Sequence, residues 1–195
     1  MFSARDERMA AAYLPLSNVV SVLYEQHAQI RDYFEAVGTL EGDARKAAFD
    51  MLRELLAKHE AAEELVMRPV TEKLLPTSFT AAREAEERDA AYELTELEQM
   101  DVQGPEFLPR LRKLEEAMWL HASREETDEF PAVLTGLSEH EQQELGRWLL
   151  RAMQHETAHP DPMLGGFPAA APVVDPYLTL LEQARDRLAK TKYEL

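Results

Sequence analysis

The sequence contains no cysteine among its 195 residues, and this absence excludes several classes of site at once. Disulfide bridges, thiolate zinc sites, iron-sulfur clusters and cysteine nucleophiles all require that side chain. A metal ion bound by this chain must therefore be held by histidine and carboxylate side chains. The chain has 6 His and 37 Asp and Glu residues to supply them.

Basic residues are few relative to acidic ones. With 21 Lys and Arg the formal net charge is -16, which repels nucleic-acid phosphates and anionic lipid headgroups. No apolar run approaches the ~18 residues needed to span a bilayer, and the opening MFSARDERMA lacks the apolar centre of a signal peptide. We expect a cytoplasmic protein, a monomer or weak homodimer, that binds neither nucleic acid nor membrane.

Glycine is also rare, with 7 residues. A low glycine content is typical of helical proteins, which need few positions with positive φ. Apolar residues recur at steps of three and four between breaker residues and predict long helices near 17–37, 43–75, 79–100 and 105–134. Short connections make consecutive helices antiparallel, so we expect an all-α, up-down-up-down four-helix bundle.

The same pattern divides the chain into three parts. Residues 1–12 are expected to be a flexible N-terminus, and residues 13–136 are expected to form the bundle. Residues 137–195 are expected to add C-terminal helices near 139–154 and 177–190, which pack on the outside of the bundle and flank a loop rich in Pro and Ala.

One motif occurs twice, in the second and fourth predicted helices. HEAAEE at 59–64 matches HASREE at 121–126, and a proline follows each His by ten residues. In each copy the His and the first Glu are four residues apart, which places both on one helix face about 6 Å apart. That separation suits two ligands of one metal centre. The paired residues are His59 with Glu63 and His121 with Glu125.

The first and third predicted helices repeat more weakly. Gln26-His27 corresponds to Glu86-Glu87, and both His27 and Glu87 lie in phase with the apolar residues of their helices. At about 1.5 Å of rise per residue, all four helices bring their polar core residues to one layer. Burying these carboxylates without a cation costs several kcal/mol each, so the layer favours a metal site over a metal-free network of salt bridges. Glu60 is a candidate extra ligand, and Glu64, Glu126, Asp128 and Glu129 are expected to be solvated.

These residues resemble the hemerythrin-like HHE cation-binding family. The resemblance rests on His27, the H-x3-E motif at 59–63 and the H-x3-E-E-x3-F-P motif at 121–131, and it covers about residues 17–134. It implies a four-helix bundle that holds two non-haem iron ions, oxo- or hydroxo-bridged when oxidised, with manganese as an alternative metal. It also implies small-molecule partners, namely oxygen, peroxide or nitric oxide.

The resemblance further implies a ligand assignment. His27 and His59 would serve one iron, and His121 and Glu87 the other. Glu63 and Glu125 would bridge the two ions. We expect no catalytic residues beyond this metal site. Tyr24, one turn before His27, is either a core aromatic residue or a hydrogen-bond donor to a bridging or metal-bound oxygen.

The third helix departs from the family pattern. The family normally has histidine there, but no histidine lies between His59 and His121, and Glu87 stands at the expected position. An alternative is that Glu87 faces solvent and that His155 or His159 is the missing ligand. A set of three His and three carboxylates stabilises ferric iron and disfavours reversible oxygen carriage. We therefore expect a protein that reacts with oxygen or peroxide, the alternative being an iron or oxygen sensor without turnover.

Overall fold

The structure is a computed structural model that describes residues 3–154 and 175–192. Every regular element in this part of the chain is helical. The elements are α1 (Ala4–Ala12), α2 (Val19–Thr39), α3 (Gly42–Ala62), η1 (Glu63–Met67), α4 (Arg68–Leu74), α5 (Thr77–Glu98), α6 (Phe107–Arg124), η2 (Glu125–Glu129), α7 (Phe130–Gly136), α8 (Glu139–Gln154) and α9 (Tyr177–Lys192).

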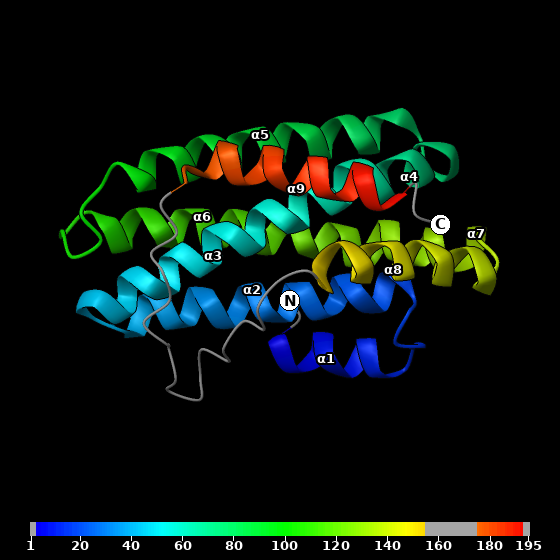
Figure 1. Ribbon diagram of the computed structural model, residues 1–195, viewed down its shortest axis with the longest axis horizontal. Helices are drawn as coiled ribbons and strands as arrows, with labels where there is room; N and C mark the ends of the chain where they lie inside the picture. Colours follow the sequence, from blue (N-terminus) through cyan, green and yellow to red (C-terminus); the bar gives the residue numbers. More distant parts are fainter. Residues whose placement is uncertain (1–2, 155–174, 193–195) are drawn as a thin grey trace.

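The bundle consists of four long helices. Two of them contain a π-helical segment, so that α3, η1 and α4 form one continuous helix, as do α6, η2 and α7. The other two are α2 and α5, and successive long helices run in alternating directions (Figure 1). The all-α bundle that the apolar periodicity predicts is therefore confirmed. The predicted Pro- and Ala-rich loop lies outside the described residues.

The N-terminal segment, predicted to be flexible, instead contains helix α1. Ser3 and Asp6 form a capping box that satisfies the free N–H groups at its start. The helix packs on α2, where Arg31 pairs with the fully buried Glu7 and Ser21 Oγ donates to the Ala11 carbonyl. These contacts join two separate helices, so the periodicity of a nine-residue segment does not reveal them.

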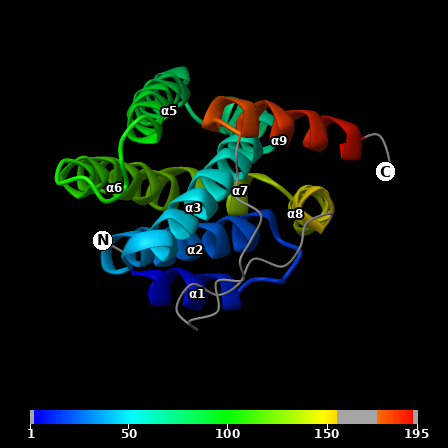
Figure 2. The same cartoon turned by 60° about the vertical axis from the view of Figure 1, so that its left-hand side comes forward.

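The two C-terminal helices pack on the bundle. Helix α8 contacts α2, whereas α9 contacts α3 and α5 (Figures 1 and 2). Trp148 on α8 donates its indole N–H to the Leu188 carbonyl of α9 at 2.9 Å, which joins the two helices. Tyr177, the first residue of α9, is buried at 4% exposure. Helix α9 thus brings a polar aromatic side chain into the interior beside α3 and α5.

Helix α8 approaches the start of α2 closely at Gly146. An added Cβ there would overlap the carbonyl oxygen of Ser17 and lie 2.8 Å from the backbone carbon of Asn18. We expect Gly146→Ala to lower the free energy of unfolding by about 1–3 kcal/mol, because overpacked backbone must move apart. Gly38→Ala is the matched control. No atom lies within 4 Å of its added Cβ, and removing a helical glycine stabilises by about 0.5–1 kcal/mol. Urea unfolding of both variants measures the difference, and equal stability of the two would contradict the close approach.

Candidate metal centre

Three histidines and two glutamates meet in the middle of the bundle. His27 comes from α2, His59 from α3 and His121 from α6, while Glu63 and Glu125 are the first residues of the π segments η1 and η2. None of the five is more than 4% exposed. The layer predicted from helix rise is present in the structure.

Each of the two glutamates lies between histidines of different helices. One oxygen of Glu63 lies 2.7 Å from His59 Nε2 and the other lies 3.4 Å from His121 Nε2. In the same way, Glu125 places one oxygen 3.3 Å from His27 Nε2 and the other 3.3 Å from His121 Nε2. Both carboxylates therefore present one oxygen to each side of the centre.

The π segments begin at these two glutamates, and the repeated prolines explain them. Each helix continues through its proline, Pro69 or Pro131, after one widened turn. In those turns the amide of Arg68 donates to the Glu63 carbonyl and that of Phe130 to the Glu125 carbonyl, five residues back. A π turn relieves the conflict between the proline ring and the preceding turn. The motif thus sets the local geometry of both glutamates.

Side chains behind the histidines fix their orientation. Nδ1 of His59 lies 3.0 Å from Gln26 Oε1, and Nδ1 of His121 lies 3.1 Å from Glu86 Oε2. Acceptors at Nδ1 place the N–H there and direct the Nε2 atoms toward Glu63 and Glu125.

The weaker repeat contained the signal for these orienting residues. Gln26 and Glu86 occupy equivalent positions, directly before His27 and Glu87 in the matched helices. Only the second residue of each pair, His27 or Glu87, was predicted to reach the central layer. The structure shows that the first residue of each pair holds a histidine of the neighbouring helix.

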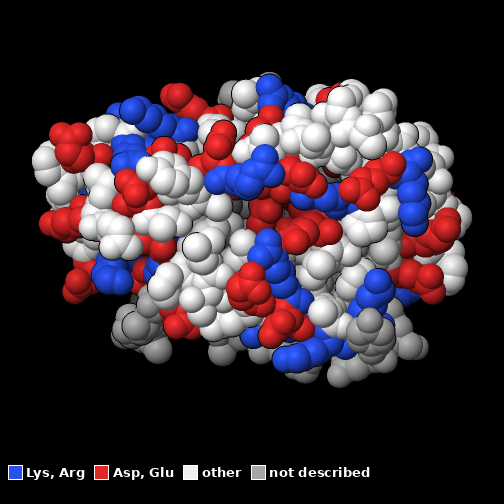
Figure 3. All heavy atoms as spheres, turned by 90° about the horizontal axis from the view of Figure 1, so that it is seen from above, with Lys and Arg blue, Asp and Glu red and all other residues white. Residues whose placement is uncertain are grey.

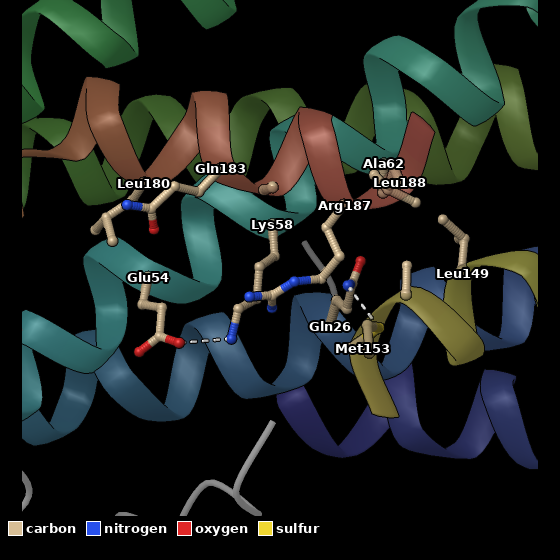
Figure 4. Close-up of a pocket in the computed structure, with 12 residues that line it drawn as sticks. Gln26, Glu54, Lys58, Ala62, Leu149, Met153, Leu180, Gln183, Arg187 and Leu188 are labelled. Atoms are coloured by element: carbon tan, nitrogen blue, oxygen red, sulfur yellow. Dashed lines mark hydrogen bonds and ion pairs between the residues drawn. The ribbon is translucent and has the colours of Figure 1, made fainter. Parts of the chain in front are cut away.

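A small cavity of about 90 Å³ lies on the far side of Gln26, between α2, α3, α8 and α9 (Figure 4). The Gln26 amide reaches Met153 Sδ on α8 at 3.5 Å, and Lys58 pairs with Glu54 at 2.8 Å along α3. The C-terminal helices therefore contact the residue that orients His59.

Two glutamates predicted to be solvated are buried instead. Glu126 is 5% exposed and accepts from His27 Nδ1 at 2.8 Å, so it orients the third histidine. Glu129 is 7% exposed, and burial together with Glu125 and Glu63 raises its pKa to about 8. Glu129 lies four residues after Glu125 and therefore on the same helix face, whereas Glu126 is held in the interior by its contact with His27 on α2.

The remaining acidic neighbours of the motif differ in exposure. Asp128 is exposed as predicted, and Glu64 is half-buried in a 2.6 Å ion pair with Arg185 of α9. The partly buried Glu60 shares a hydrogen bond with Glu87, and burial together with the charges of Glu87 and Glu63 raises its pKa to about 9. Glu60 was predicted as a candidate extra ligand, but a protonated carboxyl group binds a metal ion poorly.

Glu87 lies in the layer, and it is also ion-paired. One oxygen of Glu87 falls within 4.8 Å of ligand atoms from Glu63 and His121. Arg68 Nη2 lies 2.5 Å from one of its oxygens and 2.6 Å from the other. The negative charge that replaces a histidine on α5 is therefore balanced by a cation on α4.

Tyr24 packs at the edge of the site. Its ring meets Phe130 edge-on at 4.9 Å between centroids, and Phe130 stacks on the His27 ring at 5.5 Å. Helix α1 adds the buried Glu7, one of whose oxygens lies within 4.8 Å of ligand atoms from His27 and Glu126. Burial raises the pKa of Glu7 to about 7 although Arg31 opposes the shift. No repeat or motif includes α1, so Glu7 could not be predicted from the sequence.

The carboxylates control the protonation of His27 and His121. Burial lowers the pKa of His27, but hydrogen bonds and charge interactions with Glu125 and Glu126 outweigh it and raise the pKa to about 9. Burial also lowers the pKa of His121, and Glu125 and Glu63 raise it well above 6.5. For Glu63 the effect of burial is reversed by His59 and His121, which hold its pKa well below 4.5.

The polar atoms of the centre fit a cation. His27 Nε2, Glu63 Oε1 and Glu125 Oε2 are buried without a well-aligned hydrogen-bond partner among the described residues. Buried polar atoms left in this state are costly. All three are imidazole or carboxylate ligand atoms that point into the same space, so a divalent cation between them would satisfy each one.

The pKa shifts predict how the metal-free protein responds to pH. The raised pKa of His27 contributes stability below about pH 6.5, and that contribution is lost as pH rises through about 9. Glu129 and Glu60, with pKa values of about 8 and 9, act in the same direction, because their deprotonation is unfavourable only in the folded state. We therefore expect the melting temperature of metal-free protein to fall as the pH rises from about 5 to about 9. Metal-loaded protein should change less over this range, and a melting temperature that rises with pH in the metal-free form would contradict the assignment.

The family model of the hemerythrin HHE cation-binding domain matches residues 18–133. This chain belongs to that family. The matched region runs from α2 into α7 and contains every residue of the central layer, whereas α1, α8 and α9 lie outside it. A search of curated proteins and a search of solved structures found no match to this hemerythrin-family chain.

Three histidines, His140, His155 and His159, are not among the residues of the central layer. His140 is on the surface of α8, where it pairs with Glu144 at 3.2 Å. His155 and His159, the alternative ligands, lie outside the described residues. None of the described helices is both long and apolar enough to cross a membrane.

Proposed function

We propose that this hemerythrin-family chain binds two metal ions, most suitably iron, and reacts with oxygen or peroxide. One observation carries the proposal. Two groups of buried ligand atoms, His27 with His59, Glu63 and Glu125, and Glu63 with Glu87 and His121, share Glu63. Glu125 also lies between His27 and His121. Two adjacent ligand groups joined by carboxylates are what a bridged metal pair requires.

Each residue then has a defined task. His27 and His59 would hold the first ion, His121 and Glu87 the second, and Glu63 and Glu125 would join them. Gln26, Glu86 and Glu126 accept from the Nδ1 atoms and keep the Nε2 lone pairs directed at the ions. When bound, the pair supplies reversible transfer of two electrons between ferrous and ferric states.

The surrounding side chains exclude bulk water. Leu23 on α2, Val66 on η1 and Phe130 on α7 are fully buried next to the ligand layer. Their apolar surface strengthens charge interactions inside the site. Glu87 adds a negative charge where the family has a neutral histidine. Because Arg68 pairs with Glu87, the net charge of the site changes little.

The ligand composition favours a reaction with turnover over reversible oxygen carriage. Three imidazoles with three carboxylates form a harder ligand set that favours the ferric state. Peroxide disproportionation suits such a site, because it converts two peroxide molecules to oxygen and two water molecules with no other reductant. Manganese, which also accepts carboxylate and imidazole ligands, remains the alternative metal.

Peroxide consumption per protein chain tests this function. Metal-loaded protein should consume tens of peroxide molecules per chain, measured as oxygen release with an electrode. The same concentration of iron salt without protein provides the background. A single stoichiometric oxidation, with no further consumption, would instead support the alternative of an iron- or oxygen-responsive binding protein.

A further inference from the structure

A cavity of about 290 Å³ lies next to the layer of ligands, between α3, α5, α6 and the start of α9. His59, Glu60, Glu87 and His121 line its inner end. Tyr177 lines it from α9. The cavity therefore connects to the second ligand group directly, and a molecule inside it would lie next to that group.

The sequence of α5 explains why this space is not filled. Between Phe79 and Leu94 the helix carries only Thr, Ala and charged residues, apart from Tyr92. Tyr92 is 62% exposed and does not reach the core. The neighbouring helices α3 and α6 contribute large apolar side chains here. The side chains of α5 that face them are too small to fill the remaining space.

The walls of the cavity are apolar. Leu56, Leu94, Leu114 and Met118 form them, and Leu120, which is 52% exposed, lies at the outer end. For comparison, an apolar protein cavity of about 150 Å³ accepts benzene. The present volume therefore accommodates an organic molecule with on the order of ten non-hydrogen atoms, whereas dioxygen or hydrogen peroxide would occupy little of it.

The charges around the cavity select against anions. Of the charged residues that line it, four are acidic and two are basic: Glu86, Glu87, Asp89 and Glu93 against Lys113 and Arg124, while Glu60 is protonated. Figure 3 shows acidic side chains in the middle of one face of the molecule, with basic side chains at their margins. A field of this sign disfavours carboxylates and phosphates near the site.

We propose that this cavity binds an uncharged organic molecule with an apolar body and one polar end directed at His121 and Glu87. The inference rests on the proposed function, because it names the class of molecule that would accompany or replace hydrogen peroxide at the same centre. The polar end would meet His121 and Glu87 at the inner end of the cavity, and the apolar body would contact Leu94, Leu114 and Met118 on its walls.

Binding of two matched probes tests the proposal without any turnover. Benzyl alcohol and benzoate have similar size and differ in charge. Titration calorimetry with metal-loaded protein should give one saturable site for benzyl alcohol, with benzoate at least tenfold weaker. Equal affinity for the two probes, or no binding of benzyl alcohol, would overturn the inference.

A substitution at the wall of the cavity locates the site. Ala117 lines the cavity from an exposed position on α6, so Ala117→Phe fills space with little risk to folding. It should weaken benzyl alcohol binding at least tenfold. Ala82→Phe is the matched control, because Ala82 is exposed on α5 and is not part of the cavity. Unchanged binding in Ala117→Phe would contradict the proposed site.

The two proposals fail separately. If benzyl alcohol binds as expected but peroxide is not consumed, the proposed reaction is wrong and the binding site stands. If peroxide is consumed but neither probe binds, the reaction stands and the organic ligand is wrong.

Discussion

Glu63→Gln protein is expected to retain at most one metal ion per chain, where the parent retains two. Glu63 is the residue that both ligand groups share. The substitution preserves side-chain volume, but it removes the negative charge that lies between two histidine sets. Two neighbouring cations then repel each other with less compensation, so the loss should affect binding more than folding.

The motif supplies its own control for this experiment. Glu64 follows Glu63 directly but is half-buried and paired with Arg185 on α9. Glu64→Gln should therefore retain both ions. Elemental analysis of the three proteins, with circular dichroism to confirm folding, gives the comparison. Two full equivalents of metal in folded Glu63→Gln would show that Glu63 does not bridge.

Arg68→Leu should destabilise the metal-free protein strongly and the metal-loaded protein much less. The Arg68 and Glu87 side chains are 15% and 7% exposed, and Glu60 and Glu63 lie close to them. Removing one partner of a buried ion pair costs about 3–5 kcal/mol. For a chain of this size that corresponds to a fall in melting temperature of roughly 2–4 °C per kcal/mol.

A bound cation next to Glu87 would replace the lost arginine charge. The difference between the two forms thus reports whether Glu87 faces the metal. Melting curves with and without metal measure it, and Arg68→Leu combined with Glu87→Leu provides the double-mutant control. Equal destabilisation of both forms would indicate that Glu87 belongs to the Arg68 pair alone.

Local periodicity accounts for most of the fold and for the central layer. Helix spacing places His59 above Glu63 and His121 above Glu125, and these pairs need no information from the rest of the chain. Glu129 lies four residues after Glu125 on the same helix face, so the helical pattern could have placed it inside. The burial of Glu126 depends on its contact with His27 on another helix, which that pattern does not show.

Contacts between distant segments account for what the sequence did not reveal. Glu7 on α1 and Tyr177 on α9 reach the interior only because those helices pack on the bundle. The Arg68 partner of Glu87 lies 19 residues earlier in the chain and on a different helix. The roles of Gln26 and Glu86 could have been predicted from the sequence, because the weaker repeat aligns these two residues.

Anomalous diffraction at the iron absorption edge, from crystals of iron-loaded protein, tests the central claim most directly. The proposed centre requires two anomalous peaks per chain, one beside His27 and His59 and one beside His121 and Glu87, with the carboxylates of Glu63 and Glu125 between them. A single peak, or none within this layer, would contradict the two-metal centre.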